Sequence, residues 1–393
     1  MRSSRHKLLD ELEERTVDCT ILHESDMLLT HGPAIWRAKE FTGTPHFYPV
    51  YKYQDMYSHS LLSLILKKRR LVLDQKVLEI TESPYFTCVM SNQVLDKEIT
   101  RIGCAHKCNL AITNVDTYAQ LIASAIKEDI STVERANPGF VNVVLCGGSD
   151  SLNLLLLPWK NETIALSAEP NYQYVKKFVT QNQLNIKVLR LDDEVDLYEL
   201  DDEIMECCCR VDLAHWRWGG ALRRVAKEMD KKLVYWKGQA GDLYMSATWM
   251  AYMHPIQPAS QLFRRVYRKT NQYMPDALAH YIGQTIQPSV IQATWNRTAS
   301  LQGSHMGFIR EIADCLTISA YHGPAVMKVW EQVDLAAVAR QDMRPKVGHI
   351  LLGRDVVYPQ NNPSPAPSSF RKGLSNPQRF FDLLKQTGIK IIT

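Results

Sequence analysis

The fold of this chain is decided by the stretch Val143-Val144-Leu145-Cys146-Gly147-Gly148-Ser149-Asp150-Ser151. An apolar, β-branched run meets two glycines and an acid between two serines, and a second apolar run follows at 152–157. This pattern predicts a strand, a tight glycine turn and the start of a helix. Backbone N–H groups at such a turn make a pocket for phosphate, and a carboxylate beside them suits Mg²⁺. We therefore expect Leu145–Ser151 to bind a phosphate and Asp150 to bind a metal ion.

The bulk composition is that of an ordinary globular protein. The 393 residues leave room for one large domain and a smaller one, with 45% hydrophobic and 22% charged residues. The formal net charge of +4, from 46 basic and 42 acidic residues, argues against nucleic acid or an anionic membrane as a partner. No apolar run approaches the roughly 20 residues of a membrane span. Nine cysteines without a disulfide-framework spacing indicate reduced thiols and favour the cytoplasm.

Residues 1–115 are expected to form a small N-terminal α+β domain, in which we find no catalytic motif. A helix is predicted at Ser58–Lys68. Short strands are predicted at Thr20–Leu22, Phe47–Tyr53, Leu71–Leu73, Val77–Ile80 and Tyr85–Met90.

Residues 116–393 are expected to form the larger, α/β domain. A helix capped by Asn114 or Asp116 is predicted to run to about Arg135. Strands are then predicted at Phe140–Cys146, Thr163–Ser167, Ile186–Leu191 and Lys232–Trp236, with helices at Tyr172–Asn182 and 219–229 between them. Such alternation predicts a parallel, twisted sheet with flanking helices. From Ala247 onward the sequence predicts mostly helix.

A second glycine turn follows the strand that ends at Trp236. It reads Lys237-Gly238-Gln239-Ala240-Gly241-Asp242. Ligands of open parallel sheets bind at the carboxyl ends of the strands, so Asp150 and Asp242 are expected to face one site. Two carboxylates around a Mg²⁺-bound triphosphate form a plausible arrangement for phosphate chemistry.

The first turn resembles the SGGxDS pyrophosphate loop of the asparagine synthetase-like ATP pyrophosphatases, or PP-loop family, with Cys146 in place of the first Ser. The second turn resembles the SGEGxDE loop of the asparagine synthetases and places Asp242 on the metal-binding Asp. Gln239 then stands where asparagine synthetases have Glu and β-lactam synthetases have Tyr, which makes ordinary asparagine synthesis a poor match. The resemblance implies an adenine nucleotide alpha hydrolase-like fold over about residues 116–385, with ATP and Mg²⁺ bound. It also implies that Gly238, Gln239 and Gly241 contact the nucleotide and that Leu166 and Ser167 line its adenine pocket.

Family members carry a leucine-rich stretch followed by a basic loop near the C-terminus. Lys346–Leu352 matches the stretch, and Ser368–Gly373 matches the loop. The resemblance implies that Lys372 stabilises charge on the α-phosphate and at the acyl carbon, as a fixed cation does. Lys346 is the rival for this role, because Arg-Pro-Lys also occurs around the catalytic lysine of β-lactam synthetases. Glu311 is a candidate for assisting deprotonation of an amine.

The implied activity is ATP-dependent amide-bond formation through an acyl-adenylate. Glutamine-dependent members carry a nucleophilic Cys directly after Met1, whereas this chain has Arg2, so we expect the amine to come from a substrate. That points to a carbon–nitrogen ligase or cyclase like the β-lactam synthetases and the macrolactam cyclases of lasso peptides. Its expected role is in antibiotic or other natural-product biosynthesis or peptide modification, with a small-molecule or peptide substrate and a peptide-processing protein as a partner. Two alternatives stay open: a PP-loop enzyme that modifies tRNA, and a catalytically degenerate relative that binds nucleotide.

Overall fold

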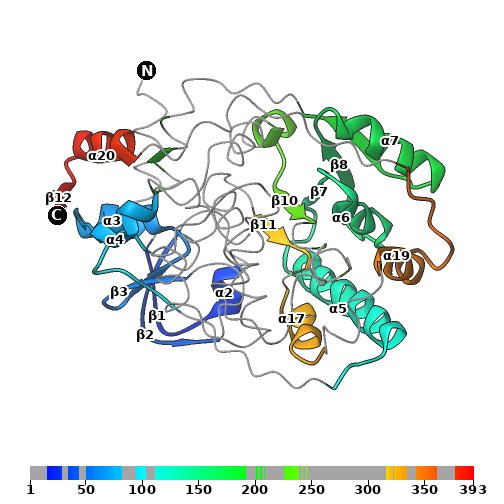
Figure 1. Cartoon of the computed structure of the whole chain (residues 1–393), viewed down its shortest axis with the longest axis horizontal. Helices are drawn as coiled ribbons and strands as arrows, with labels where there is room; N and C mark the ends of the chain where they lie inside the picture. The colour runs from blue at the N-terminus through cyan, green and yellow to red at the C-terminus, as the bar shows by residue number, and fades with distance from the viewer. Residues whose placement is uncertain are drawn as a thin grey trace.

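The computed structural model describes residues 16–28, 34–43, 50–81, 94–102, 111–191, 201, 204–205, 208, 225–238, 241, 245, 316–321, 323–333, 342–360 and 377–393. These residues form a mixed α/β structure in which one sheet is wholly parallel and another is mixed (Figure 1). The α/β class predicted from the sequence is therefore confirmed. No helix among the described residues is both long enough and apolar enough to cross a membrane.

The parallel sheet contains the glycine turns. Its strands are β7 (Val141–Leu145), β8 (Thr163–Ser167), β9 (Lys187–Arg190), β10 (Leu233–Lys237) and β11 (Leu316–Ser319). They lie in the order β11-β10-β7-β8-β9, and every neighbouring pair is parallel. The chain thus runs outward from β7 to β9 and then returns to the other side of β7 with β10. The topological switch point of the sheet lies between β7 and β10.

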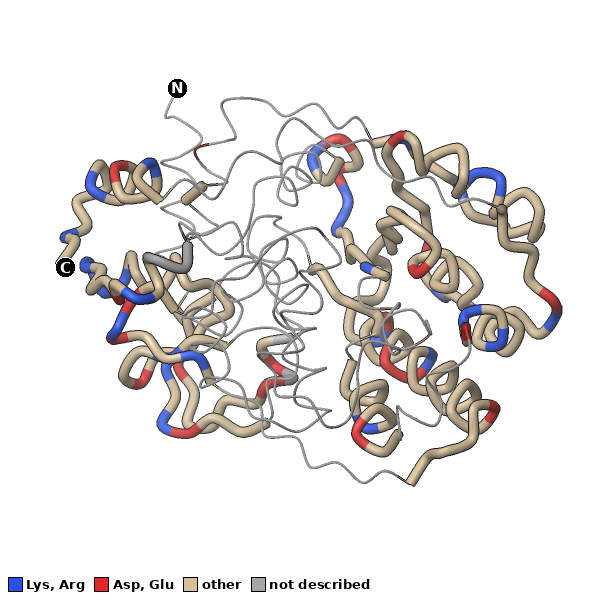
Figure 2. Tube along the Cα trace, in the orientation of Figure 1, with Lys and Arg blue, Asp and Glu red and all other residues tan. Residues whose placement is uncertain are grey.

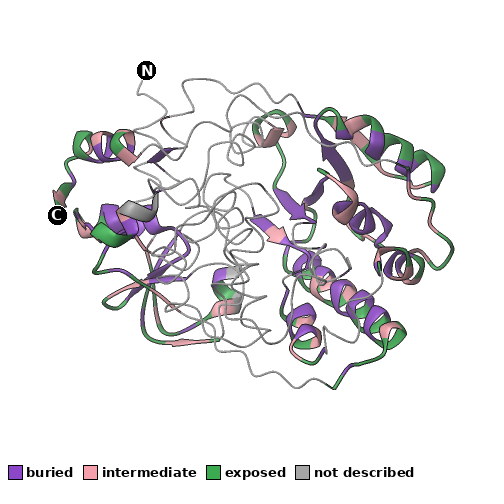
Figure 3. Cartoon of the chain, viewed as in Figure 1, coloured by how far each residue is buried: buried purple, intermediate pink, exposed green. Residues whose placement is uncertain are grey.

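Both faces of the parallel sheet are buried. Along β7, Val143 and Leu145 pack with Tyr235 on one face, while Val144 belongs to the core of the opposite face. That second face is covered by α5 (Val115–Ala136), α7 (Asn171–Gln181), α17 (Pro324–Trp330) and α19 (Arg344–Leu352). Residues 225–229 pack on the first face. Figure 3 shows β7 and β10 buried, and α5 and α7 with one buried side and one exposed side, as expected for helices that cover a sheet.

Helix α5 shows how the sequence determines the boundaries of these elements. The Asn114 side chain accepts hydrogen bonds from the N–H groups of Asp116 (2.9 Å) and Thr117 (3.0 Å), so Asn114 is the N-cap of the two candidates. Tyr118, Ile122 and Ile126 are fully buried along one side of the helix. This is the periodicity from which the helix was predicted.

A buried polar network fixes the amino end of the sheet. Asn142 donates from Nδ2 to Glu134 Oε1 on α5 (2.8 Å) and accepts from Trp236 Nε1 on β10 (2.8 Å). Glu134 Oε1 also accepts from the backbone N–H groups of Lys160 (3.1 Å) and Asn161 (3.0 Å). Because a buried polar group costs free energy unless it is hydrogen-bonded, this network disfavours any shift of β7 against β10.

The mixed sheet lies in the N-terminal part of the chain. Its strands are β1 (Thr16–His23), β2 (Ile35–Thr42), β3 (Tyr51–Tyr53), β4 (Met56–Ser58) and β6 (Thr100–Arg101), in the order β1-β2-β4-β3-β6. Strands β1 and β2 are parallel and the other pairs antiparallel. Helix α3 (Leu61–Lys68) begins after its N-cap, Ser60, and lies within the predicted helix at Ser58–Lys68.

The C-terminal residues join this N-terminal part. Strand β12 (Lys390–Ile392) pairs in parallel with β5 (Arg70–Val72), and the apolar side of α20 (Pro377–Gln386) shares a core with α3. In Figure 1, α20 and β12 accordingly lie beside α3 and α4. The division at residues 115 and 116 stays a prediction, but the core of the first part includes residues from the end of the chain.

One predicted strand is wrong. Val77–Ile80 lies within the helix α4 (Gln75–Thr81), although its apolar residues are typical of a strand. The reason is the side chain of Asp74, whose Oδ1 accepts hydrogen bonds from the N–H groups of Lys76 (3.0 Å) and Val77 (3.3 Å) and so begins a helix. The predicted strand Tyr85–Met90 lies outside the described residues. The strands β2, β4 and β6 and the short helix α2 (Glu24–Leu28) were not expected.

Candidate functional site

The first glycine turn lies at the carboxyl end of β7. Gly147 and Gly148 lead into the short helix α6 (Ser149–Leu152) and a 3-10 turn, η2 (Asn153–Leu156). Ser151 Oγ donates to the carbonyl of Gly148 (2.8 Å), and Asn171 Nδ2, from α7, donates to the carbonyl of Gly147 (2.8 Å). A Cβ added to Gly147 would meet no described atom within 4 Å. The turn is therefore fixed through its carbonyls, and Gly147 faces open space.

The second glycine turn packs directly against the first. Lys237, the last residue of β10, is in register with Leu145, the last residue of β7. A Cβ on Gly238 would lie 2.6 Å from the backbone nitrogen of Ser151, and a Cβ on Gly241 would lie 2.8 Å from Asp150 Cβ. Only glycine permits so close an approach. The structure therefore brings Gly238 and Gly241 together with Ser151 and Asp150 at the switch point.

Cys146, Leu166 and Ser167 lie beside the first turn with buried side chains. The N–H of Cys146 donates to the carbonyl of Leu166 (2.8 Å), and Ser167 Oγ donates to the carbonyl of Cys146 (2.5 Å). The Cys146 side chain belongs to the core beneath the sheet, and burial raises the pKa of its thiol to about 12. Leu166 packs with Leu145 on the opposite face. These contacts join the ends of β7 and β8, and the thiol of Cys146 is a buried core group.

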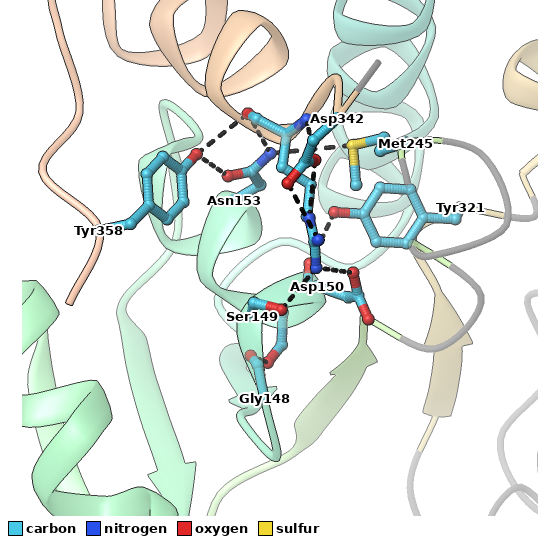
Figure 4. A network of polar contacts seen from close by, with 10 residues as sticks. Gly148, Ser149, Asp150, Asn153, Met245, Tyr321, Asp342 and Tyr358 are labelled. Carbon is cyan, nitrogen blue, oxygen red and sulfur yellow. Dashed lines mark hydrogen bonds and ion pairs between the residues drawn. The ribbon is translucent and has the colours of Figure 1, made fainter. Parts of the chain in front are cut away.

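An arginine that the sequence analysis passed over lies at the first turn. Arg344 Nη1 donates to Ser149 Oγ (2.7 Å) and lies 3.3 Å from Asp150 Oδ1 (Figure 4). Its Nε donates to Asp342 Oδ1 (2.9 Å) and its Nη2 to Asp342 Oδ2 (3.0 Å). From the other side, Tyr321 Oη donates to the backbone carbonyl of Asp150 (2.8 Å). Asp150 is thus held by groups from the ends of β11 and α19.

The backbone of Arg344 is fixed at the first turn of α19. Its carbonyl accepts from Asn153 Nδ2 (3.1 Å) and lies 3.0 Å from Tyr358 Oη. The Tyr358 hydroxyl also contacts Asn153 Oδ1, and Figure 4 shows the two side chains facing each other. Gly348 makes this possible, because a Cβ there would collide with the Tyr358 hydroxyl. The feature of the sequence that could have indicated a fixed position for Arg344 is the proline that follows it, Pro345, because proline is favoured in the first turn of a helix.

The structure separates Lys346 from Asp150. Lys346 Nζ pairs with the carboxylate of Asp116 in the first turn of α5, and both side chains are largely exposed. Four other residues singled out from the sequence lie outside the described residues: Lys372, Glu311, Gln239 and Asp242. Their roles stay predictions.

Lys237 is a buried lysine that the sequence analysis did not consider. It ends β10 next to Gly238 and is only 8% exposed. Burial lowers the pKa of its ammonium group to about 7. A group with this pKa changes its charge near neutral pH, at the strand end where the two turns meet.

The oxygen atoms at the first turn fit a Mg²⁺ ion. The Asp150 carboxylate, 29% exposed, and the Ser149 hydroxyl are both hard oxygen donors, which Mg²⁺ prefers. Within the described ranges no three His, Cys, Asp or Glu side chains gather into a metal site. The described part of the site therefore offers one carboxylate and leaves positions for phosphate oxygens and water, as is usual for Mg²⁺ in nucleotide sites.

No protein-family model matches the chain, and no curated protein matches it. A functional interpretation therefore rests on the geometry at the switch point and on the sequence of the two turns.

Proposed function

We propose that this protein is an ATP-dependent, AMP-forming enzyme that makes an amide bond through an acyl-adenylate. The observation that carries the proposal is the meeting of two glycine turns at the switch point between β7 and β10. In open parallel sheets the crevice at this point is where nucleotides bind, because loops from adjacent strands diverge to opposite faces there. The residues of both turns resemble those of the ATP pyrophosphatases, and this likeness suggests the finer adenine nucleotide alpha hydrolase-like fold.

The geometry of the first turn supports a role in phosphate binding. Its carbonyls are engaged by Asn171 and Ser151, and this fixes the orientation of the peptide groups. A Cβ on Gly147 would point into open space, so a ligand can approach the backbone. Backbone N–H groups in a fixed glycine turn at a strand end form the usual cradle for a phosphate chain.

The proposed reaction has two steps. A carboxylate oxygen of the substrate attacks the α-phosphorus of ATP, an oxygen–phosphorus bond forms, and the bond to the β-phosphate breaks with release of pyrophosphate. An amine nitrogen then attacks the acyl carbon, an amide bond forms, and AMP leaves while the amine loses a proton. Both steps develop negative charge, on the phosphate and then on the acyl oxygen, and fixed cations near these atoms lower the barrier.

Each group at the site has a part in this proposal. Asp150 and Ser149 hold Mg²⁺, which supplies neutralising charge for the phosphates when it is bound. We further propose Lys372 as the cation near the α-phosphate and the acyl carbon, and Glu311 as the group that assists loss of the amine proton. These two roles rest on the family resemblance of the sequence. The carboxylate and amine are proposed to belong to a small molecule or a peptide, as in a lactam-forming cyclase.

Two observations bear on the alternatives. The Cys146 side chain lies in the core, so replacement of the first Ser of the loop by Cys leaves the face of the turn unchanged and gives little support to a degenerate site. Over most of the described chain Lys and Arg are interspersed with Asp and Glu (Figure 2). In the one run of four basic residues seen there, at 67–70, Lys68 pairs with Asp96 and Arg70 with Glu98, which does not favour a tRNA-binding face. We therefore rank amide synthesis above the degenerate nucleotide-binding relative and above the tRNA-modifying enzyme.

The test is ATP–[³²P]pyrophosphate exchange with Mg²⁺ across a pool of carboxylic acids. We expect exchange with at least one acid, because adenylation is reversible before the amine attacks. In the Asp150→Ala variant exchange should fall by roughly a hundredfold or more, as expected when a group that holds the metal ion is lost. Asp355→Asn is the matched control, since this acid is fully exposed beside His349.

The outcomes separate the candidate functions. Exchange that disappears with Asp150→Ala and persists with Asp355→Asn supports adenylation and names the acid. Tight ATP binding without exchange for any acid would favour the nucleotide-binding relative, and exchange stimulated only by tRNA and an amino acid would favour the tRNA enzyme. A chain that binds no ATP would contradict the proposal.

A further inference from the structure

Arg344 is positioned more firmly than a surface arginine in an ion pair requires. Its backbone carbonyl is held by Asn153 and Tyr358, and the N–H of the preceding residue, Met343, donates to the carbonyl of Met245 (2.6 Å). Met343 is fully buried, and Pro345 restricts the backbone that follows. The Cα of Arg344 therefore has a fixed place at the start of α19, across from the first glycine turn.

Asp342 then sets the direction of the guanidinium. Its carboxylate accepts from Nε and Nη2 of Arg344 and also from the Arg344 backbone N–H (3.1 Å). A two-point contact between a carboxylate and one edge of a guanidinium fixes the plane of the group. The opposite edge, with Nη1, is directed at Ser149 and Asp150 (Figure 4). The side chain is thus oriented before any ligand arrives.

The contacts of Nη1 lie where a phosphate chain would lie. Ser149 and Asp150 directly follow Gly148, and the Arg344 side chain is 21% exposed, so solvent reaches this edge. Arg344 stands between two carboxylates, and this cluster alone carries a net negative charge that would repel ATP. A Mg²⁺ ion held by Asp150 would reverse this balance, and the guanidinium would then face the phosphates of ATP. A planar guanidinium matches the spacing of phosphate oxygens.

We propose that Arg344 is a phosphate-binding residue, whose Nη1 contacts Ser149 and Asp150 and also contacts the β- and γ-phosphates when Mg²⁺-ATP binds. Asp342 is its positioning residue and keeps the other edge of the guanidinium in place. This inference rests on the proposed function in one respect, namely that ATP binds at the first glycine turn. Arg344 then also stabilises the charge of the departing pyrophosphate.

The test compares ligands that have the β- and γ-phosphates with one that does not. The affinities of Mg²⁺-ATP, Mg²⁺-pyrophosphate and AMP are measured by calorimetry for the full chain and for Arg344→Gln. We expect ATP and pyrophosphate to bind at least about tenfold more weakly to the variant, which is the loss typical of a charge-assisted hydrogen bond. AMP should bind within about twofold of the unmodified protein, since a phosphate contact beyond the α-position leaves it unaffected.

Two further variants sharpen the result. Arg344→Lys keeps the charge but cannot bind Asp342 and a phosphate at once. Its affinity for ATP should therefore lie between that of the unmodified protein and that of Arg344→Gln. Arg379→Gln is the matched control, because Arg379, which lies on α20 in the other part of the molecule, makes a two-point contact with Asp201 (2.9 and 2.6 Å). It should leave all three affinities unchanged.

The possible failures are distinguishable. Equal losses for ATP and AMP would mean that Arg344 only supports the structure, and unchanged ATP affinity would mean that it does not contact phosphate; either result overturns the inference alone. ATP binding that depends on Arg344, without pyrophosphate exchange for any acid, supports the inference while the proposed adenylation fails. Absence of ATP and pyrophosphate binding in the unmodified protein overturns both.

Discussion

The regions around the two five-stranded sheets hold their polar groups in different ways. At the carboxyl ends of the parallel sheet, Asp150 meets Tyr321 and Arg344, which lie 171 and 194 residues away in the sequence. In the region of the mixed sheet, Lys68 and Arg70 meet Asp96 and Glu98, which are each 28 residues away. All strands of a parallel sheet end at the same edge, so loops far apart in sequence gather there. Lys68 ends α3 and Arg70 lies in β5, and both meet acids from the described segment 94–102 that follows α4, so this cluster forms between neighbouring parts of the chain.

The two clusters also differ in exposure. The side chains of Lys68 and Asp96 are completely buried, with Nζ 2.6 Å from Oδ1, and Lys68 also lies over the ring of Tyr53. Arg344 and Asp150 keep 21% and 29% of their side chains exposed. A buried pair satisfied by its neighbours is a structural element, whereas a pair open to solvent is accessible to a ligand. The comparison predicts that breaking the pair of Lys68 and Asp96 changes the free energy of unfolding. Breaking the pair of Arg344 and Asp150 is predicted to change ligand binding.

The largest effect is expected from Lys68→Met. The substitution leaves the buried Asp96 carboxylate without its ammonium partner, and breaking such a pair typically costs about 3–5 kcal/mol of the free energy of unfolding. ATP affinity should stay unchanged, because no contact of Lys68 reaches the glycine turns. Urea denaturation and calorimetry measure the two quantities. Arg70→Met, at the exposed pair with Glu98, should cost much less. A loss of ATP affinity in Lys68→Met would break the distinction between the two regions.

A smaller effect on stability is expected from Gly238→Ala. The new Cβ collides with the backbone of Ser151, and overpacking of this kind costs about 1–3 kcal/mol. The two turns must then move apart, so ATP affinity should fall as well. Gly147→Ala is the contrast, since its Cβ points into open space and stability should change by less than about 0.5 kcal/mol. If Gly147→Ala also leaves ATP affinity unchanged, the phosphates do not lie over that residue.

The smallest effect per step of the measurement, taken as one pH unit, is expected in the pH dependence of stability. Because the pKa of Lys237 is lowered to about 7 in the folded protein, the unfolded chain binds more protons between about pH 7 and pH 10. The free energy of unfolding should therefore rise with pH across this window, by up to about 1.4 kcal/mol per pH unit from this one group. Lys237→Met should flatten the profile. A slope that is the same in both proteins would show that Lys237 keeps its ordinary pKa.

The parts of the fold that could be predicted are those with strong local patterns. Strand β8 has the bounds expected for it, Thr163–Ser167, because an apolar run lies between polar segments. Helix α5 was predicted from its spaced apolar residues and a capping side chain. The error at α4 arose because the cap, Asp74, outweighed the strand propensity of the residues after it. Strand β11 has only four residues, too few for their alternation of apolar and polar side chains to predict a strand, and it depends on β10 for its place in the sheet.

The site could be predicted only where its residues follow one another in the sequence. The first glycine turn and its neighbour at Gly238 were visible as motifs. Arg344, Asp342 and Tyr321 were not, because contacts across nearly 200 residues leave no local pattern. In the Arg344-Pro345-Lys346 segment the sequence favoured the lysine as the functional cation, while in the structure the lysine pairs with Asp116 and the arginine lies at the turn.

The pairing of β12 with β5 has a consequence for biosynthesis. Residues 70–72 leave the ribosome long before residues 390–392 exist, so the early region waits for its last strand and for the Phe380 and Phe381 side chains of its core. During that interval the parallel sheet, which lies entirely between them, can already assemble. Domains commonly fold in order as they emerge during translation. Here the segment synthesised first is the one completed last, and part of its apolar core stays uncovered until α20 and β12 have been made.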